Sequence, residues 1–92
     1  MIRSFACADT DALFHSRSVA RFRNIERAAR RKLLQIHAAS ELASLRVPPG
    51  SHFEALRADR KGQYSIRIND QWRICFVWKA DGAHEVEIVD YH

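Results

Sequence analysis

The longest periodic pattern of apolar residues runs from about Val19 to Leu42. Apolar and small residues recur there at spacings of three and four, as on one face of an α-helix. They are Phe22, Ile25, Ala29, Leu33, Ile36 and Ser40. The basic residues of this segment lie largely off this stripe; they include Arg23, Arg27, Arg30 and Arg31. The pattern predicts a helix over 19–42 that packs one face on the rest of the domain and carries positive charge on the other.

Shorter elements are predicted before this helix. Ile2 to Phe5 alternates weakly and is a candidate first strand. Ala8 to Asp11 offers several N-cap side chains, so we expect a short helix over Ala12 to His15. The helical region ends by Val47-Pro48-Pro49-Gly50, because two prolines and a glycine continue neither a helix nor a central strand.

The rest of the chain has the pattern of strands. The candidates are Phe53–Leu56, Tyr64–Ile68, Trp72–Lys79 and Glu85–Tyr91, with turns at Asp59–Gly62 and Ala80–Ala83. In the third run one face carries Trp72, Ile74, Phe76 and Trp78, and the other carries Arg73, Cys75, Val77 and Lys79. Helices followed by an antiparallel sheet predict an α+β domain, and 92 residues leave room for a single one over 1–92.

The turn between the second and third strands can be predicted from parity. Residues that face each other across an antiparallel pair lie on the same side of the sheet. A three-residue Asn69-Asp70-Gln71 loop matches Ile66 with Ile74, whereas a two-residue loop would place Ile66 opposite Arg73. We therefore predict the three-residue loop. It also brings Arg67 and Arg73 together on the face away from the core, where the pair is a candidate phosphate site.

The charge of the chain points towards a polyanionic partner. Lys and Arg outnumber Asp and Glu by 15 to 11, giving a net charge of +4. Between Arg17 and Lys32 there are seven basic residues and one acid, Glu26. Such a patch fits an anionic partner, and charge alone favours a solvated helix face equally well.

Other classes of protein have little support. Cys7 and Cys75 have the spacing of neither a zinc site nor a disulfide framework, so we expect two reduced, buried thiols. No apolar run is long enough for a membrane span or a signal peptide, and we expect a cytoplasmic protein without membrane contact. There is no Walker loop, GxGxxG, HExxH or GxSxG motif. The remaining inventory of basic residues, histidines and tyrosines suits RNA cleavage without metal or cofactor.

Five histidines could supply an acid or a base. His15 and His37 lie on predicted helices and His84 follows a turn, so a structural role is favoured for each. His52 lies in a loop and its role stays open. His92 follows Asp90 and Tyr91 at the end of a strand, where a frayed terminus is the ordinary expectation.

Four segments resemble the HigB (host-inhibition-of-growth) branch of the RelE-like toxins. They are Leu56–Arg60, Tyr64–Asn69, Asp70–Phe76 and Glu87–His92. The resemblance covers essentially the whole chain, and Trp72-Arg73 and Asp90-Tyr91-His92 are its most specific parts. It implies a microbial-RNase fold, with N-terminal helices packed on an antiparallel sheet. It also implies cleavage of messenger RNA in the A site of the 30S subunit by attack of a 2′-hydroxyl on the phosphate.

The same resemblance implies partners and residue roles. The partner would be a HigA-like helix-turn-helix antitoxin, through which the toxin reaches operator DNA indirectly. Arg73 would stabilise the scissile phosphate, His92 would act as acid or base, Tyr91 would stack on a base or aid catalysis, and Asp90 would support its neighbours. Arg57 matches a phosphate-binding basic residue, and we add Arg67, Arg60 and Lys61 as candidate RNA contacts. Weaker candidates for contact with the antitoxin or ribosomal RNA are Arg23, Arg27, Arg30 and Arg31.

Four points depart from the family pattern or leave alternatives. Arg57 stands where a lysine is common, which keeps the charge but changes a point donor into a flat fork. Glu54 stands where some members have a histidine, so either Glu54 or His52 could move the proton. If His92 shares a strand face with Ile88, Tyr91 lies on the other, so we predict that the strand twists or ends before Tyr91. A non-enzymatic inhibitor of gyrase, like the ParE relatives, is the alternative function.

Overall fold

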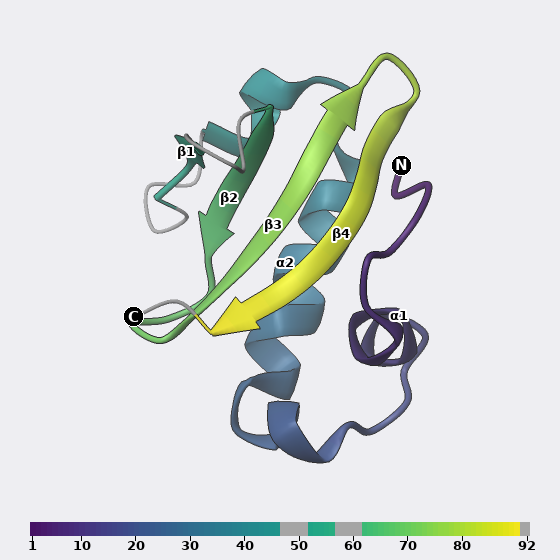
Figure 1. The fold of residues 1–92 in the computed structure, drawn as a ribbon, viewed down its shortest axis with the longest axis vertical. Helices are drawn as coiled ribbons and strands as arrows, with labels where there is room; N and C mark the ends of the chain where they lie inside the picture. Colours follow the sequence, from purple (N-terminus) through teal and green to yellow (C-terminus); the bar gives the residue numbers. More distant parts are fainter. Residues whose placement is uncertain (47–51, 57–61, 91–92) are drawn as a thin grey trace.

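The computed structural model describes residues 1–46, 52–56 and 62–90. Within these residues two α-helices and two 3₁₀ helices come first, followed by four strands (Figure 1). In chain order they are α1 (Ala8–Phe14), η1 (Ala20–Ile25), α2 (Glu26–Ala38), η2 (Leu42–Arg46), β1 (Glu54–Ala55), β2 (Gln63–Arg67), β3 (Trp72–Lys79) and β4 (Gly82–Asp90).

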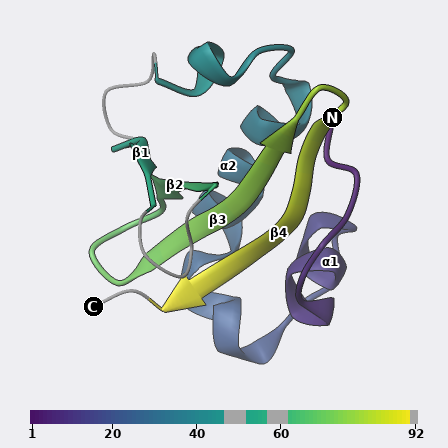
Figure 2. The same ribbon diagram turned by 45° about the horizontal axis from the view of Figure 1, so that its top comes forward.

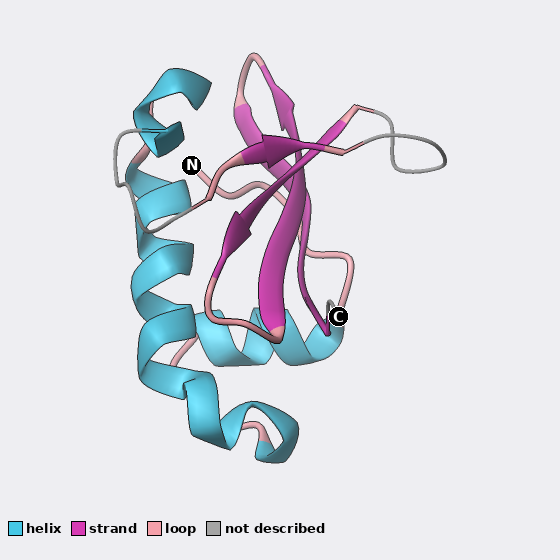
Figure 3. Cartoon of the chain, turned by 90° about the vertical axis from the view of Figure 1, so that its left-hand side faces the viewer, coloured by secondary structure: helices cyan, strands magenta, loops and turns pink. Residues whose placement is uncertain are grey.

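The strands form one antiparallel sheet in the order β1-β2-β3-β4. The helix α2 runs along one face of the sheet, and α1 lies beside β4 (Figures 1 and 3). The opposite face, turned towards the viewer in Figure 1, is covered by neither helix. The α+β class and the layer of helices on an antiparallel sheet are confirmed.

The predicted helix over 19–42 is wrong in its extent. Ala20–Ile25 is a 3₁₀ helix. The helical geometry is interrupted at Ile25, which has φ −119° and ψ 4°, and α2 begins after it. The pair Phe22 and Ile25 explains the local choice, because residues three apart lie directly above one another in a 3₁₀ helix and both side chains are buried. The α-helix then ends at Ala38, where Ala39 turns to extended backbone and buries its methyl group.

The first helix is longer than predicted and begins earlier. It spans Ala8–Phe14 rather than 12–15, with Cys7 at the N-cap and no side-chain cap hydrogen bond. The expected capping acids Asp9 and Asp11 instead occupy the first turn of the helix. Carboxylates are favourable there because they oppose the positive end of the helix dipole.

The N-terminal segment follows β4 without forming a regular strand. Isolated parallel bridges join Ile2 to Ala83 and Phe5 to Val86, and Figure 2 shows the segment beside β4. Gly82 makes this approach possible, since a Cβ atom on it would lie 2.1 Å from the carbonyl oxygen of Met1. The predicted first strand is thus reduced to two isolated bridges.

The predicted turn between β2 and β3 is confirmed. The register pairs Ile66 with Ile74 and Arg67 with Arg73. The Asn69 Oδ1 atom accepts hydrogen bonds from the backbone N–H groups of Gln71 (2.9 Å) and Trp72 (2.8 Å). This side chain closes the loop, which explains why an asparagine stands at its first position.

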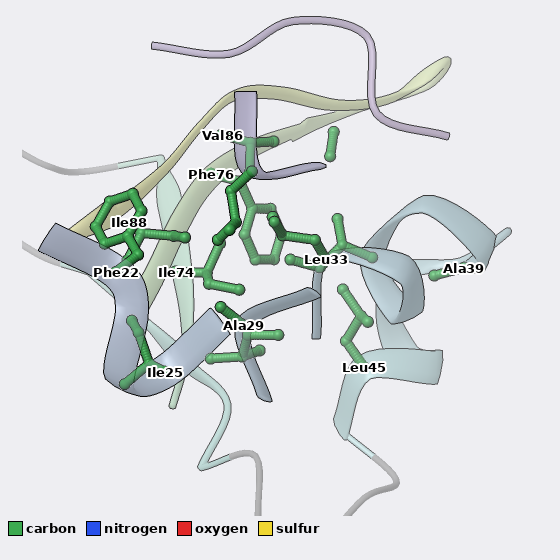
Figure 4. Packing of buried hydrophobic residues seen from close by; sticks show 14 residues of the cluster. Phe22, Ile25, Ala29, Leu33, Ala39, Leu45, Ile74, Phe76, Val86 and Ile88 are labelled. Carbon is green, nitrogen blue, oxygen red and sulfur yellow. The ribbon is translucent and has the colours of Figure 1, made fainter. Parts of the chain in front are cut away.

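The core lies between α2 and the sheet (Figure 4). Ala29, Leu33 and Ile36 of α2 are completely buried, as the periodic stripe predicts. They belong to one cluster with Ile74, Phe76, Val86 and Ile88. Full burial of such aliphatic and aromatic side chains stabilises by about 1.5 to 3 kcal/mol each, so this layer fixes which face of the sheet stays open.

Candidate functional site

Two arginines lie opposite each other on the face of the sheet that the helices leave uncovered. Arg67 of β2 and Arg73 of β3 are register partners, one position beyond the buried pair Ile66 and Ile74. Because side chains alternate between the faces of a strand, both arginines point away from the core. The predicted arginine pair is therefore present, at the end of the sheet where β2 finishes and β3 begins.

Arg73 is held by several acceptors and is only 12% exposed along its side chain. Its Nε donates to Ser65 Oγ at 3.0 Å, and its Nη2 donates to the carbonyl oxygen of His52 at 2.6 Å. Glu54 Oε1 lies 3.5 Å from the same Nη2. A guanidinium so withdrawn from water needs these partners, because an unpaired buried charge is strongly unfavourable.

Arg67 is the more open member of the pair, with a side chain 32% exposed. It forms an ion pair with Asp70 in the neighbouring loop. Its Nη1 also lies 3.4 Å from the imidazole Nε2 of His52. Both arginines therefore have a carboxylate neighbour in the free protein, and an RNA phosphate would compete with it.

The segment that carries His52 and Glu54 brings the other polar groups to the pair. His52 has φ +46°, the left-handed region that side chains disfavour, and its carbonyl oxygen faces Arg73. Glu54 pairs with Ser65 in the β1–β2 ladder, and Ser65 in turn pairs with Cys75 of β3. Glu54 and His52, left open as proton carriers by the sequence, thus both lie at the arginine pair.

Asp90 lies at the end of β4, on the opposite face of the sheet from Arg73. The register pairs it with Trp72, whereas Val89 lies opposite Arg73. Asp90 Oδ2 accepts a hydrogen bond of 3.1 Å from Gln71 Nε2 in the β2–β3 loop. This hydrogen bond ties the end of β4 to that loop.

Several predicted site residues lie outside the described part of the chain. They are Arg57, Arg60, Lys61, Tyr91 and His92. The predicted change of course before Tyr91 falls there as well, and β4 pairs regularly with β3 from Glu87 to Asp90.

The four arginines of the helical region divide into two groups. Arg23, Arg27 and Arg31 are exposed; Arg27 and Arg31 lie one turn apart on the same face of α2, and Arg23 belongs to the preceding 3₁₀ helix. Arg30 is only partly exposed, and its Nε and Nη2 donate to the carbonyl oxygens of Leu13 (2.9 Å) and Arg17 (3.0 Å). Arg30 therefore joins α2 to the end of α1, which favours a structural role for it.

Three histidines have the structural roles that the sequence favours. His37 Nδ1 accepts the backbone N–H of Ile2 at 3.1 Å. His15 contacts Asp11 at 2.9 Å and His84 contacts Asp81 at 2.7 Å. The hydrogen bond from His84 lowers the pKa of Asp81 below its ordinary value.

Both cysteines are free thiols, and only Cys75 is buried. The expectation of two buried thiols is wrong for Cys7, which is half-buried at the N-cap position of α1. Partial burial raises the pKa of the Cys7 thiol, but hydrogen bonds from Thr10 and Asp9 and the charge of Arg21 outweigh it and lower the pKa.

Ser65 is the site residue that sequence reasoning missed. It is completely buried, although it lies on the outer face of the sheet beside the arginines. Its sequence signal is a small hydroxyl residue two positions before Arg67, on the same face of one strand. That signal is weak, since only the fold shows that Arg73 reaches across to this hydroxyl.

A family model settles the class of the protein. The model described as "RelE-like toxin of type II toxin-antitoxin system HigB" matches residues 11–92. The chain belongs to the HigB family of RelE-like toxins. Such toxins are generally ribonucleases, and a type II system pairs its toxin with an antitoxin, so an antitoxin is a partner of this HigB toxin.

Two relatives agree with this assignment. "Toxin HigB-1" of Vibrio cholerae serotype O1 is 44% identical over 69 residues, which cover 75% of this chain and 72% of that protein. An uncharacterised protein of Haemophilus influenzae is 38% identical over 56 residues, covering 61% of this chain and 54% of that protein. Within the described residues no helix is long and apolar enough to cross a membrane.

Proposed function

We propose that this HigB toxin is a ribosome-dependent endoribonuclease that cleaves messenger RNA in the A site and arrests growth from the cytoplasm. The observation that carries the proposal is the pairing of Arg67 and Arg73 on the uncovered face of the sheet. Two cations side by side repel each other, and a phosphate between them relieves that repulsion. A sheet face that neither helix covers also suits a polymer presented by the ribosome.

Cleavage requires a base, a cation and an acid around one phosphate. Glu54 is the base in this scheme, because its carboxylate is half exposed and lies 3.5 Å from Arg73, whereas the imidazole of His52 faces Arg67. Glu54 takes the proton of the 2′-hydroxyl, whose oxygen attacks phosphorus. Arg73 stabilises the negative charge of the phosphorane.

The reaction ends when the bond from phosphorus to the 5′ oxygen breaks. His92 donates the proton that the leaving 5′ oxygen needs, and the other product carries a 2′,3′-cyclic phosphate. No metal or cofactor takes part in this scheme. Tyr91 stacks on a neighbouring base, and Asp90 supports the end of β4 through Gln71.

Further basic residues would bind the RNA on either side of the cleaved bond. Arg57, Arg60 and Lys61 stand between β1 and β2 in the sequence. Each phosphate contact of this kind adds affinity without base preference and makes binding weaker at high salt.

The exposed arginines Arg23, Arg27 and Arg31 form a second positive surface, on η1 and on α2. Partial burial lowers the pKa of Lys32, and the charge of the neighbouring Arg31 lowers it further. We propose that this surface binds an acidic segment of a HigA-like helix-turn-helix antitoxin or ribosomal RNA. The antitoxin would carry the toxin to operator DNA.

Primer extension on translating ribosomes tests the proposed reaction. The wild-type toxin should produce cleavage in the A-site codon, and Arg73→Ala and His92→Ala should abolish both cleavage and growth arrest. Lys79→Ala is the matched control, since Lys79 is an exposed cation on the same face of the same strand at its other end. Unchanged growth arrest in both site variants, or gyrase inhibition without RNA cleavage, would overturn the proposal.

A further inference from the structure

Two buried polar side chains stand out among the described residues, Thr10 and Ser65, both with no exposed surface. The Thr10 hydroxyl accepts the backbone N–H of Ile88 at 3.0 Å, which joins α1 to β4 within the fold. The Ser65 hydroxyl instead accepts a hydrogen bond from a functional side chain, Arg73 Nε, at 3.0 Å. The two hydroxyls are equally buried, but only one of them acts on the candidate site.

The backbone of His52 supplies a second hydrogen-bond acceptor for Arg73, beside the Ser65 hydroxyl. The His52 carbonyl oxygen accepts from Arg73 Nη2 at 2.6 Å, while Ser65 Oγ accepts from Nε. A guanidinium is planar, so acceptors at two of its nitrogens fix both its position and the direction of its plane. The backbone of His52 has φ +46°, which residues with a side chain disfavour. The surrounding contacts must therefore hold it in this conformation.

We propose that Ser65 is a positioning residue for RNA cleavage. Together with the His52 carbonyl it forms a cradle that holds the Arg73 guanidinium in one orientation before the substrate arrives. This inference rests on the proposed function, because it explains how the sheet arginine of that reaction is oriented. Groups fixed in advance stabilise developing charge without reorganising, and a displacement of about 1 Å costs about 100-fold in rate.

The burial of Arg73 supports a cradle over a chance contact. Its side chain is 12% exposed, against 32% for Arg67 and 50% for Glu54. Arg67 is thus free to follow a phosphate by moving in solvent, whereas Arg73 is confined by its surroundings. The catalytic geometry therefore depends on the cradle more than on the RNA.

The direct test replaces Ser65 by alanine and measures single-turnover mRNA cleavage on programmed ribosomes. Ser65→Ala should lower the rate at saturating toxin by about 10- to 100-fold, while the toxin concentration for half-maximal rate changes less than about 3-fold. Thr10→Val is the matched control, since it also removes one buried hydroxyl acceptor. It should lower urea stability to a similar degree and leave the saturating rate unchanged.

A second background separates positioning from a general loss of structure. Arg73→Lys keeps a charge but has no Nε–H to donate to Ser65. Ser65→Ala should therefore reduce cleavage in the wild-type background and cause no further loss in the Arg73→Lys background. An equal fold-loss in both backgrounds, or a wild-type rate for Ser65→Ala, would refute the cradle.

A readout without RNA keeps the two proposals distinguishable. In ¹⁵N NMR spectra of the free toxin, the Arg73 Nε–H proton should exchange slowly with solvent, and Ser65→Ala should speed its exchange while Thr10→Val does not. If the wild-type toxin fails to cleave on ribosomes, the proposed function is wrong and this exchange still judges the cradle. Exchange equal in wild type and Ser65→Ala would refute the cradle even if cleavage occurs.

Discussion

Replacing Arg30 by alanine should destabilise the fold, although Arg30 lies among arginines that look alike in the sequence. Arg30 Nε donates to the Leu13 carbonyl oxygen at 2.9 Å, and its Nη2 donates to the Arg17 carbonyl oxygen at 3.0 Å. Both acceptors belong to the end of α1 and the residues just after it. The alanine variant thus loses the contact that joins the C-terminal end of α1 to α2.

The size of the loss follows from the exposure of the side chain. Hydrogen bonds to charged groups contribute about 1.5 to 3 kcal/mol each, and 30% exposure of the Arg30 side chain favours the lower limit. The alanine variant regains about 1 kcal/mol because Arg30 no longer has to be ordered in the folded state. The ion pair with Glu26, at 3.6 Å, adds little because it is partly exposed. We expect a net loss of about 2 kcal/mol in the free energy of unfolding, and a melting temperature lower by about 8 to 16 °C.

Urea denaturation followed by circular dichroism at 222 nm measures this loss. Arg27→Ala is the matched control, because Arg27 is one turn away on α2, is exposed, and its side chain makes no hydrogen bond with the described residues. It should change stability by less than about 0.5 kcal/mol. Equal stabilities for the two variants would show that the contact between the helices is not formed in solution.

Three further outcomes are expected. Leu33→Ala should cost about 2 to 5 kcal/mol in urea denaturation because Leu33 is fully buried, whereas its neighbour Leu34, 57% exposed, should tolerate alanine with little loss; similar costs would contradict the helix face observed here. Gly82→Ala should lower the free energy of unfolding by more than about 1 kcal/mol. The new Cβ would lie 2.1 Å from the N-terminal residue's carbonyl oxygen, and residue 82 has φ +128°, which side chains disfavour. A neutral result would refute that close approach. The rate of Cys7 alkylation should reach its plateau at a lower pH than the rate for a free cysteine, because the pKa of the Cys7 thiol is lowered. Arg21→Ala should move this pH–rate profile to higher pH, because the charge of Arg21 helps to lower the pKa. A profile unchanged by Arg21→Ala would show that Arg21 does not lower the pKa of Cys7.

The sequence determined the elements whose side chains repeat with a clear period. The stripe of Ala29, Leu33 and Ile36 predicted the buried face of α2, because burial on a helix follows its 3.6-residue period. Parity between two alternating strands predicted the loop at Asn69 and the pairing of Arg67 with Arg73. Both are local rules, in which neighbouring residues settle the outcome.

The ends of the helices were decided by packing and not by the periodic pattern. A continuous stripe suggested one helix over 19–42, but the same spacing of three serves a 3₁₀ turn at Phe22 and Ile25. The start of α1 at Ala8 likewise lacks a capping side chain. Tertiary contacts fixed these boundaries, since local propensities on either side of them differ by fractions of a kcal/mol.

The partners of the site arginines were decided only by the tertiary structure. The sequence identified Arg73 and left Glu54 and His52 open, but nothing local shows that a residue of β3 reaches the hydroxyl of Ser65 and a carbonyl oxygen 21 positions away. Arg30 and Arg27 look equivalent in the sequence, yet Arg30 donates to the end of α1 whereas Arg27 faces solvent. Periodicity determines which face a side chain occupies, whereas the atoms that meet on that face depend on how distant segments are brought together.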